Sequence, residues 1–527
     1  MQQRNCAGWR YRAVIYIGIM NLPTSNTPVQ STLDLQLGTE VAGDRRDFLR
    51  QLGQAGAWTA SALAGMPAIA APNKGVAEAA ALRKKVRGTV IGQGDRAWPH
   101  WCEGMVWQQR KPTRRPPLIV RASNETDVIE AVRFAKRHGL KVAVRTGGHS
   151  IWATHMRDEG LLIDLSQLTR SSFNREDRSA VVQPALWGYH LIERAAPLGL
   201  AFPVAHCSQV ALGGYLIGGG LGLNHDTWGQ MACFGIEGAD VVTASGELVT
   251  VDARQNADLY WAVRGAGQGF PGIVTKLHLK LQTRPQQVLA SMYVLPLQRA
   301  SEAVTWIEQA IGADPPSLEV LMLLAYGPSG QAVAIVIVNA FAASSDEAHA
   351  SLAPFASSEL AKTALFKMEG QSSSMEKLLE VSVNPMTGAG FGAQAVDVIW
   401  TARGSEAVAA AAHHIARAAS PMTHAVIAFK SGRPLPADAA CSRTDRVFVG
   451  LYSAWLGTEG NAANIAWLRE ASRALQPFAS GHYINEIDVE ATPQKAEQCF
   501  APQAWRRLAE VRRQHDPDGL FHSFYGL

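Results

Sequence analysis

The sequence lacks the features that define several common classes of protein. Its six cysteines form no C-x-x-C pair and show no metal-ligand spacing, and in a chain of 527 residues they do not predict a disulfide framework. The 49 lysines and arginines are interleaved with the 45 aspartates and glutamates, so no basic stripe suggests nucleic acid. The apolar runs are too short for a membrane span. These absences argue against a metal site, a nucleic-acid partner and a membrane-spanning helix.

What the sequence does contain is the composition of a globular protein with more than one domain. Hydrophobic residues make up 47% and charged residues 18%, which is typical of chains that form a packed core. A length of 527 residues exceeds that of one ordinary domain. We predict five segments: a signal region at 1–70, a lead-in at 71–112, a first domain at 113–285, a second domain at 286–480, and a C-terminal segment at 481–527 that returns to the first domain.

An export signal is indicated by paired arginines ahead of an Ala/Gly-rich run. Arg45 and Arg46 precede a weakly apolar stretch that ends in a small-residue cleavage pattern at 68–70. Paired arginines point to the twin-arginine export route, and the alternative is an N-terminal amphipathic helix. We therefore expect an exported protein, periplasmic or secreted, whose mature chain begins near Ala71.

The first domain begins as a strand–helix–strand unit. The run "LIVR" reads as a short strand, Asn124 as the N-cap of a helix that ends at Gly139, and "KVAVR" as the next strand. This order predicts an α/β organisation. After about residue 286, longer strand-like runs alternate with Ala-rich helical stretches, which predicts a second domain with a large sheet.

A dense glycine cluster follows a single cysteine in "AHCSQVALGGYLIGGGLG", residues 205–222. Glycine loses more backbone entropy on folding than any other residue, so this density indicates a place where bare backbone must approach a ligand. The cluster has neither the register of the dinucleotide fingerprint G-x-G-x-x-G nor the G-K-[ST] of a phosphate loop. The glycines must serve some other close approach.

Three segments together resemble one family. They are "VAVRTGGHS" (142–150), "HCSQVALGGYLIGGGLG" (206–222) and "NADLYWAVRGAGQGFPGIVT" (256–275). The pattern resembles the FAD-linked oxidoreductases of the vanillyl-alcohol oxidase superfamily, with its PCMH-type FAD-binding domain, and most closely the berberine-bridge-enzyme-like branch. The resemblance covers roughly 113–285 and returns weakly at 481–527. It implies an α+β fold, in which a FAD-binding domain of two α/β subdomains adjoins a substrate domain with a large antiparallel sheet backed by helices.

The resemblance also implies an FAD held by two covalent bonds, through a ring nitrogen of His149 and the sulfur of Cys207. Imidazole and thiolate are both nucleophiles able to add to an activated flavin, and thiolate is the reactive form of cysteine. Two tethers are expected to raise the reduction potential of the flavin. The other expected cofactor contacts are Arg145, Thr146, Gly147, Gly148 and Ser150 at the pyrophosphate, Gly213, Gly214, Gly218 and Gly219 beside the flavin, Ile273 and Val274 toward the adenine, and Asn485.

The catalytic base is expected in the C-terminal segment. Relatives often read Y-x-N-Y-x-D there, and this chain has Tyr483, Asn485 and Asp488 in place but Glu486 at the second tyrosine. A proton must leave the substrate hydroxyl or amine as hydride passes to the flavin, which requires a base close by. Tyr483 and Glu486 are the two candidates. Glu486 could equally be a surface carboxylate on a loop.

Val210, three residues after the cysteine of the motif, bears on the electron acceptor. In the resembling family a valine there accompanies oxidases, and bulkier aliphatic residues accompany dehydrogenases. We therefore predict an oxidase that takes hydride from a small alcohol, sugar or secondary metabolite and passes electrons to O2, giving H2O2. A dehydrogenase that uses a quinone or carrier, and a flavin-loaded binding protein without turnover, remain as alternatives. The sequence assigns no oligomeric state.

Overall fold

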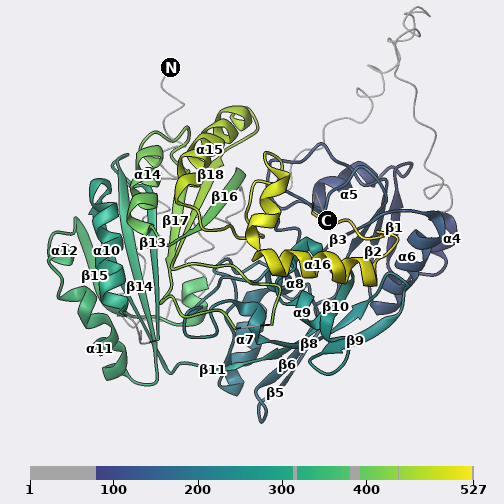
Figure 1. Cartoon of the computed structure of the whole chain (residues 1–527), viewed down its shortest axis with the longest axis horizontal. Helices are drawn as coiled ribbons and strands as arrows, with labels where there is room; N and C mark the ends of the chain where they lie inside the picture. The colour runs from purple at the N-terminus through teal and green to yellow at the C-terminus, as the bar shows by residue number, and fades with distance from the viewer. Residues whose placement is uncertain (1–78, 313–316, 380–391, 437, 525–527) are drawn as a thin grey trace, which may run out of the picture.

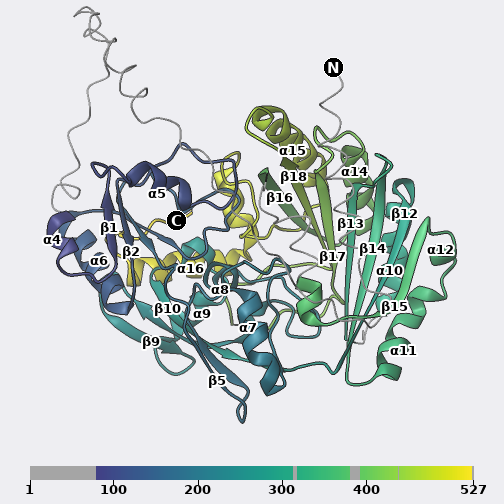
Figure 2. The ribbon, with the colours of Figure 1, turned by 180° about the vertical axis from the view of Figure 1, so that it is seen from behind.

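A computed structural model describes residues 79–312, 317–379, 392–436 and 438–524. Figures 1 and 2 show two bodies side by side, each built on β-sheet with helices packed against it. We call residues 79–285 the N-terminal part, residues 286–480 the central part and residues 481–524 the C-terminal segment. The predicted signal region at 1–70 lies outside the described residues.

The N-terminal part opens with a small, mostly parallel sheet. Its strands lie in the order β1-β2-β4-β3, and β1 is the antiparallel edge strand. Asn124 caps the following helix by accepting a hydrogen bond from the Asp127 amide at 3.0 Å, and Gly139 ends the helix in a left-handed conformation. The predicted strand–helix–strand unit is thus confirmed. The elements are β1 (Thr89–Gly92), β2 (Leu118–Arg121), α6 (Glu125–His138), β3 (Val142–Arg145) and β4 (Leu161–Asp164).

A second sheet in the N-terminal part is antiparallel throughout. Its order is β5-β6-β10-β8-β9, with short helices in the connections. One of those helices, α8, lies inside the glycine cluster and contains Gly213 and Gly214. The elements are β5 (Ser171–Asn174), β6 (Ser179–Val182), α7 (Gly188–Ala195), β7 (Leu200–Ala201), α8 (Leu212–Ile217), β8 (Ile236–Val242), β9 (Leu248–Asp252), α9 (Ala257–Val263) and β10 (Ile273–Lys280).

The central part is organised around one seven-stranded antiparallel sheet. Its order is β15-β12-β14-β13-β17-β18-β16, and every residue of β16 and β18 is buried. The predicted large antiparallel sheet backed by helices is confirmed, and with it the α+β fold. The strands are β12 (Gln287–Pro296), β13 (Leu318–Tyr326), β14 (Ala332–Ala342), β15 (Phe366–Ser372), β16 (Ala393–Thr401), β17 (His424–Phe429) and β18 (Val447–Trp455); the longer helices are α10 (Ala300–Ile311), α11 (Ser345–Ala356), α14 (Gly404–Ile415) and α15 (Asn461–Leu475).

The C-terminal segment lies against both parts. Its helix α16 (Pro502–His515) runs beside the N-terminal part in both views (Figures 1 and 2). Beyond the helix, Phe521 bridges Val142 of β3, and the His522 amide donates to the Val142 carbonyl at 2.9 Å. At the other end Gly481 bridges Trp400 of β16. One chain segment therefore ties the small parallel sheet to the large antiparallel one.

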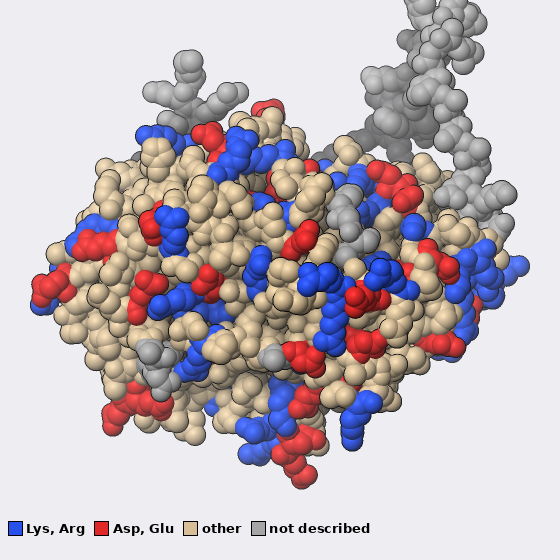
Figure 3. Space-filling view, in the orientation of Figure 1, with Lys and Arg blue, Asp and Glu red and all other residues tan. Residues whose placement is uncertain are grey.

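The largest cluster of buried apolar side chains is shared by both parts and the C-terminal segment, from Trp152 to Phe524. A separate cluster fills the space between α6 and the first sheet. On the face seen in Figure 3, lysines and arginines alternate with aspartates and glutamates. Among the described residues, no helix combines the length and apolar character that crossing a bilayer requires.

Candidate active site

Two nucleophilic side chains from separate loops meet in the N-terminal part. His149 lies in the loop after β3, and Cys207 lies in the loop between β7 and α8. The Cys207 sulfur is 3.6 Å from His149 Nε2, although the residues are 58 positions apart in the chain. The His149 ring also stacks on Trp107, with ring centroids 4.4 Å apart and an interplanar angle of 12°. The stacking partner holds the imidazole plane in one orientation beside the thiol.

Burial sets the protonation state of this pair. It lowers the pKa of His149 to about 4, because the imidazolium would lose its hydration. It raises the pKa of the Cys207 thiol for the same reason, since the thiolate is the charged form. At neutral pH the imidazole is therefore neutral, with a free lone pair, and the sulfur is a thiol. The neutral imidazole can form a bond to carbon directly, and the Cys207 thiol can do so once it has lost its proton.

The glycines around this pair are required by neighbouring protein atoms. A Cβ on Gly148, whose φ is +69°, would lie 2.5 Å from the Met105 carbonyl oxygen. A Cβ on Gly147 would lie 2.8 Å from the Ala211 side chain, and one on Gly218 would lie 1.9 Å from Asn485 Oδ1. Gly214, in contrast, has open space, with only Thr146 Oγ1 at 3.7 Å. The bare backbone thus serves loop-to-loop packing at most of these positions, a reason that sequence reasoning did not consider.

Arg145 is used to hold its own loop. Its guanidinium donates to the Asp164 carboxylate at 2.7 Å and to the Met105 carbonyl at 2.9 Å, and it reaches the Thr146 and Gly147 carbonyls at 3.2 Å. These bonds fix the path of the loop that carries His149. Arg145 therefore contributes to the site by positioning the backbone.

The remaining expected cofactor residues lie in varied surroundings. Ser150 Oγ is 3.2 Å from Thr154 Oγ1, and Gly213 packs against Pro184 and Thr146. Ile273 and Val274 begin β10 with their side chains buried in two different apolar clusters. Val210 packs on the main cluster while its carbonyl accepts from the Gly188 amide. Thr146 lies beside Gly213 and Gly214, whereas Gly219, with a φ of +109°, lies beside Met231 and Tyr483.

Tyr483 points its hydroxyl at the glycine cluster. The phenolic oxygen accepts hydrogen bonds from the Gly220 amide at 3.1 Å, the Leu221 amide at 3.3 Å and Asn485 Nδ2 at 2.9 Å. Asn485 also donates to the Tyr215 carbonyl at 3.2 Å, beside Gly218. Burial, reinforced by the charge of Glu486, raises the pKa of Tyr483. These contacts suit a side chain that braces the loop.

Glu486 is only partly exposed, so it is not a loop carboxylate free in solvent. The Tyr452 hydroxyl donates to Glu486 Oε2 at 2.6 Å, and the Tyr452 ring lies parallel to His424 with centroids 5.3 Å apart. Burial raises the pKa of Glu486, although the Tyr452 hydrogen bond and the charge of His206 oppose that shift. A carboxylate with a raised pKa is a stronger base than an ordinary glutamate and takes up a proton at a higher pH.

A buried ion pair joins this region to the large sheet. Glu319 of β13 accepts from His206 Nε2 at 3.0 Å, from the Asn224 amide at 3.0 Å and from Asn339 Nδ2 at 3.1 Å. His225 Nδ1 lies 3.8 Å from the same carboxylate. Burial alone would raise the pKa of Glu319 and lower that of His206, but their mutual attraction outweighs it in both cases. The carboxylate is therefore ionised and His206 is held as its cationic partner.

Comparisons with known proteins identify an FAD-binding domain and similar oxidoreductases. A family model described as FAD binding domain matches residues 116–252. FAD-linked oxidoreductase nodO of Hypoxylon pulicicidum is 28% identical over 417 residues, which are 78% of this chain and 91% of the relative. (R)-6-hydroxynicotine oxidase of Paenarthrobacter nicotinovorans is 32% identical over 35% of this chain and 40% of the relative. The chain therefore contains an FAD-binding domain, and it is an FAD-dependent oxidoreductase similar in sequence to these relatives.

Solved structures show the same fold for this oxidoreductase. 6-Hydroxy-D-nicotine oxidase from Arthrobacter nicotinovorans superposes with a TM-score of 0.72 at 23% identity, over 84% of this chain and 98% of that one. A berberine-bridge-enzyme-like protein from Physcomitrella patens superposes with a TM-score of 0.73 at 18% identity, over 84% and 97%. The predicted resemblance to berberine-bridge-enzyme-like proteins is confirmed at the level of the fold.

The residues around His149 and Cys207 fit an FAD. The fit rests on the chemistry of these two side chains, which present a neutral imidazole and a thiol together, and on the open space over Gly214.

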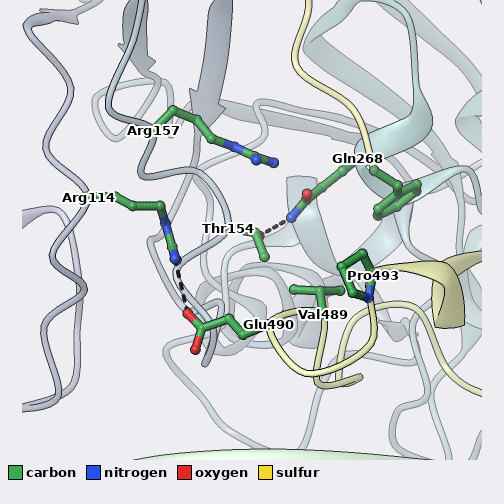
Figure 4. A pocket seen from close by; sticks show the side chains of 8 residues that line it. Arg114, Thr154, Arg157, Gln268, Val489, Glu490 and Pro493 are labelled. Atoms are coloured by element: carbon green, nitrogen blue, oxygen red, sulfur yellow. Dashed lines mark hydrogen bonds and ion pairs between the residues drawn. The ribbon is translucent and has the colours of Figure 1, made fainter. Parts of the chain in front are cut away.

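A small pocket close to the loop that carries His149 is lined by Arg114, Thr154, Arg157 and Gln268 (Figure 4). There Gln268 donates to Thr154 Oγ1, and Arg114 pairs with Glu490 of the C-terminal segment at 3.1 Å.

Sequence reasoning missed the ion pair of Glu319 and His206, which lies next to the candidate site. A signal for each was present. Glu319 is the one charge in the apolar run "SLEVLMLLAYG", and His206 directly precedes the cysteine of the motif. A single acid in a strand that is otherwise apolar needs a buried partner, because an unpaired buried charge is strongly unfavourable. The identity of that partner depended on the fold.

Proposed function

We propose that this oxidoreductase is an oxidase that carries FAD tethered through His149 and Cys207. The observation that carries the proposal is the 3.6 Å approach of the two side chains, from loops that are distant in the chain. The FAD would accept hydride from a substrate carbon and pass the electrons to an acceptor. The protein contributes the tethers, the two loops that Arg145 and Tyr483 respectively hold in place, and a base for the substrate proton.

Glu486 is the base in this proposal, and Tyr483 is a positioning residue. The Tyr483 oxygen is already bound by three N–H donors, and the raised pKa of its hydroxyl keeps it protonated at neutral pH. Glu486 has a raised pKa and one strong hydrogen bond, to the Tyr452 hydroxyl. As the carboxylate it would take the proton from a substrate hydroxyl or amine, and Tyr452 would orient it.

Molecular oxygen is the proposed acceptor, with H2O2 as the product. Val210 supports this choice, since its short side chain packs on the main apolar cluster next to Cys207. One solved relative, a variant of berberine bridge enzyme, is called a reticuline dehydrogenase, and another is called chitooligosaccharide oxidase. Both acceptor types thus occur on this fold. We propose a small alcohol, sugar or secondary metabolite as substrate, and export by the twin-arginine route.

Acid precipitation tests the tethers first. Yellow colour that stays with the precipitated wild-type protein indicates covalent flavin, and colour left in the supernatant contradicts the proposal. Cys207→Ala and His149→Ala should each keep one tether, and the double variant should release all the colour. Cys102→Ala is the matched control, because Cys102 is a buried thiol in a different apolar cluster.

Rapid mixing of the reduced protein with air then separates the acceptor types. Reoxidation within seconds with H2O2 release supports the oxidase. Reoxidation over many minutes identifies a dehydrogenase. A flavin that no member of a panel of alcohols, sugars and amines can reduce would point to the binding protein without turnover.

A further inference from the structure

We propose that the substrate of this oxidase is an alcohol or amine with a large apolar body, rather than a sugar. This substrate class rests on the proposed function, because the reacting group is placed at Glu486. The body would lie on one face of the seven-stranded sheet, where four apolar side chains remain partly exposed. We call these four the open face: Leu321 and Leu323 of β13, Ile337 of β14 and Val426 of β17.

The two faces of this sheet are covered to different degrees. Successive side chains of a strand point to opposite faces, and on β13 Met322 is fully buried whereas Leu321 and Leu323 are partly exposed. The buried face packs on helices. Met322 shares it with Tyr293 of β12, whose ring centroid lies 5.3 Å from that of Trp306 in α10. The open face is turned the other way and is only partly covered.

The open face is continuous with the candidate active site. Leu323 pairs with Val426, and His424, two residues earlier on β17, pairs with Tyr452 of β18. Paired residues on neighbouring strands, and residues two apart on one strand, point to the same face. The open face therefore shares its side of the sheet with Tyr452, whose hydroxyl donates to Glu486 Oε2 at 2.6 Å. A substrate group that meets Glu486 has the open face beside it.

The other end of the open face lies beside one of the proposed tethers. Glu319 is two residues before Leu321 on β13 and therefore points to the same side of the sheet. Its carboxylate accepts from His206 Nε2 at 3.0 Å, and His206 directly precedes Cys207 in the chain. The open face thus spans the sheet between the residue that contacts the Cys207 loop and the residue that orients the proposed base.

This part of the sheet offers the hydroxyls of a sugar no hydrogen-bond partners. On the described strands β12, β14, β13 and β17, every side chain on this face between the row of Glu319 and the row of His424 is apolar. These side chains are the open face itself together with Met292, Val294, Ile335 and Ala428. A hydroxyl that loses its water here without a new partner is unfavourable, whereas apolar carbon gains from leaving water. The face therefore selects for hydrocarbon.

An apolar cluster continues from the open face toward the edge of the sheet. Its buried centre is Met292, Val294, Val333 and Ile335, and Leu323 and Ile337 of the open face pack against it. The cluster is separate from the main apolar cluster and extends from β13 across β14 to β12. Neighbouring strands lie about 4.8 Å apart, so these three strands cover about 10 Å. That width supports an apolar body larger than a single ring.

Tertiary alcohols test the apolar site on the flavin-loaded protein. They have no hydrogen on the carbinol carbon, so they can bind without being oxidised. Titration with 2-methyl-2-hexanol and 2-methyl-2-octanol, followed by the change in flavin absorption, gives a Kd for each. We expect Kd to fall by about fourfold for each added CH2, which is the gain for taking one CH2 out of water. Equal Kd values would overturn the proposal, as would flavin reduction by glucose or cellobiose but not by perillyl alcohol.

Variants then locate the binding. Leu323→Asn should raise the Kd of 2-methyl-2-octanol by about tenfold, because the alkyl chain meets an amide. Val426→Thr, which nearly keeps the side-chain volume, should act in the same direction and serves if Leu323→Asn does not fold. Leu248→Asn is the matched control, since Leu248 is 43% exposed on β9, and its Kd should equal that of the wild type. Equal Kd values in all the proteins would overturn the assignment to the open face.

The proposed function can fail separately. Binding of tertiary alcohols requires no hydride transfer. A protein that binds them with the expected dependence on chain length, but whose flavin no alcohol or amine reduces, would contradict the oxidase and support the apolar site. A protein whose flavin sugars reduce, and whose Kd does not depend on chain length, would support an oxidase and overturn the apolar substrate class.

Discussion

The N-terminal and central parts place their functional groups on different kinds of structure. In the N-terminal part, His149 and Cys207 lie on loops whose path depends on glycines and on backbone hydrogen bonds from Arg145. In the central part, Glu319 and Tyr452 lie on long strands of one sheet. Loop residues of this type leave motifs in the sequence, since the backbone geometry needs particular residues. Functional residues on strands leave almost no motif in the sequence, because a buried strand accepts any apolar residue at the neighbouring positions.

The largest expected effect is on turnover and comes from Glu486, which lies in the C-terminal segment, outside both parts. Glu486→Gln should lower kcat by about 10²–10⁴-fold, because the amide cannot accept the substrate proton. In the wild type, kcat should rise with pH through the raised pKa of Glu486, since the carboxylate is the active form. The variant should lose this rise. Steady-state turnover between pH 5 and 9 measures both, and an unchanged profile in Glu486→Gln would eliminate this base.

The next prediction compares the loss of a fully buried carboxylate on a strand with the loss of a partly exposed carboxylate. Glu319→Ala should cost about 3–5 kcal/mol of unfolding free energy, because it removes a fully buried carboxylate that accepts hydrogen bonds from His206, Asn224 and Asn339. Glu376→Ala is the matched control in the same part. Its pair with Arg284, at 2.8 Å, is partly exposed, so about 0–1 kcal/mol is expected. Urea unfolding of both variants measures the difference, and equal losses would contradict the assigned role of Glu319.

This ion pair also has a defined pH window. Because the pKa of Glu319 is lowered in the folded state, ionised Glu319 stabilises the fold fully above the unfolded pKa of about 4.3. This stabilisation is lost as the pH falls through the folded pKa. Because the pKa of His206 is raised in the folded state, protonated His206 stabilises the fold fully below the unfolded pKa of about 6.5. This stabilisation is lost as the pH rises through the folded pKa. The stability difference between wild type and Glu319→Ala should therefore be largest between these two limits.

Loop packing in the two parts can be compared by substituting one glycine in each part. Gly148 has a φ of +69° and no room for a Cβ, whereas Gly457 has a φ of +71° and nothing within 4 Å. Gly457→Ala should cost about 1–2 kcal/mol from backbone strain alone. Gly148→Ala should cost about 1–3 kcal/mol more, because the methyl group meets the Met105 carbonyl. Equal Tm values for the two variants would show that the N-terminal loop yields easily.

The smallest expected effect concerns Tyr483. Tyr483→Phe removes the acceptor for the Gly220 and Leu221 amides and should cost about 1–3 kcal/mol. Tyr260→Phe is the control, since its partly exposed hydroxyl only donates to the Ile236 carbonyl, and about 0.5–1.5 kcal/mol is expected. Turnover should stay within a few-fold of wild type in both. A loss as large as that of Glu486→Gln would make Tyr483 the base.

The strand–helix–strand unit, the large second sheet and the family could all be predicted from the sequence. Asn124 and Gly139 are short-range signals, and their cap and left-handed turn occur as predicted. The role of Arg145 was less accessible. Its guanidinium lies against Asp164 and the loop carbonyls, and Asp164 is brought next to it by the pairing of β3 with β4. A motif identifies the residue, but only the sheet register shows what it binds.

By itself the sequence determined the local devices of this oxidoreductase: the helix caps, the glycines and the two-part motif of His149 and Cys207. Each depends on backbone geometry or on residues near in the chain. The tertiary structure alone decided the pairing of Glu319 with His206, 113 positions apart, and of Glu486 with Tyr452, 34 apart. Such contacts form only when apolar burial has packed the sheets together, and no local pattern records which polar groups then meet.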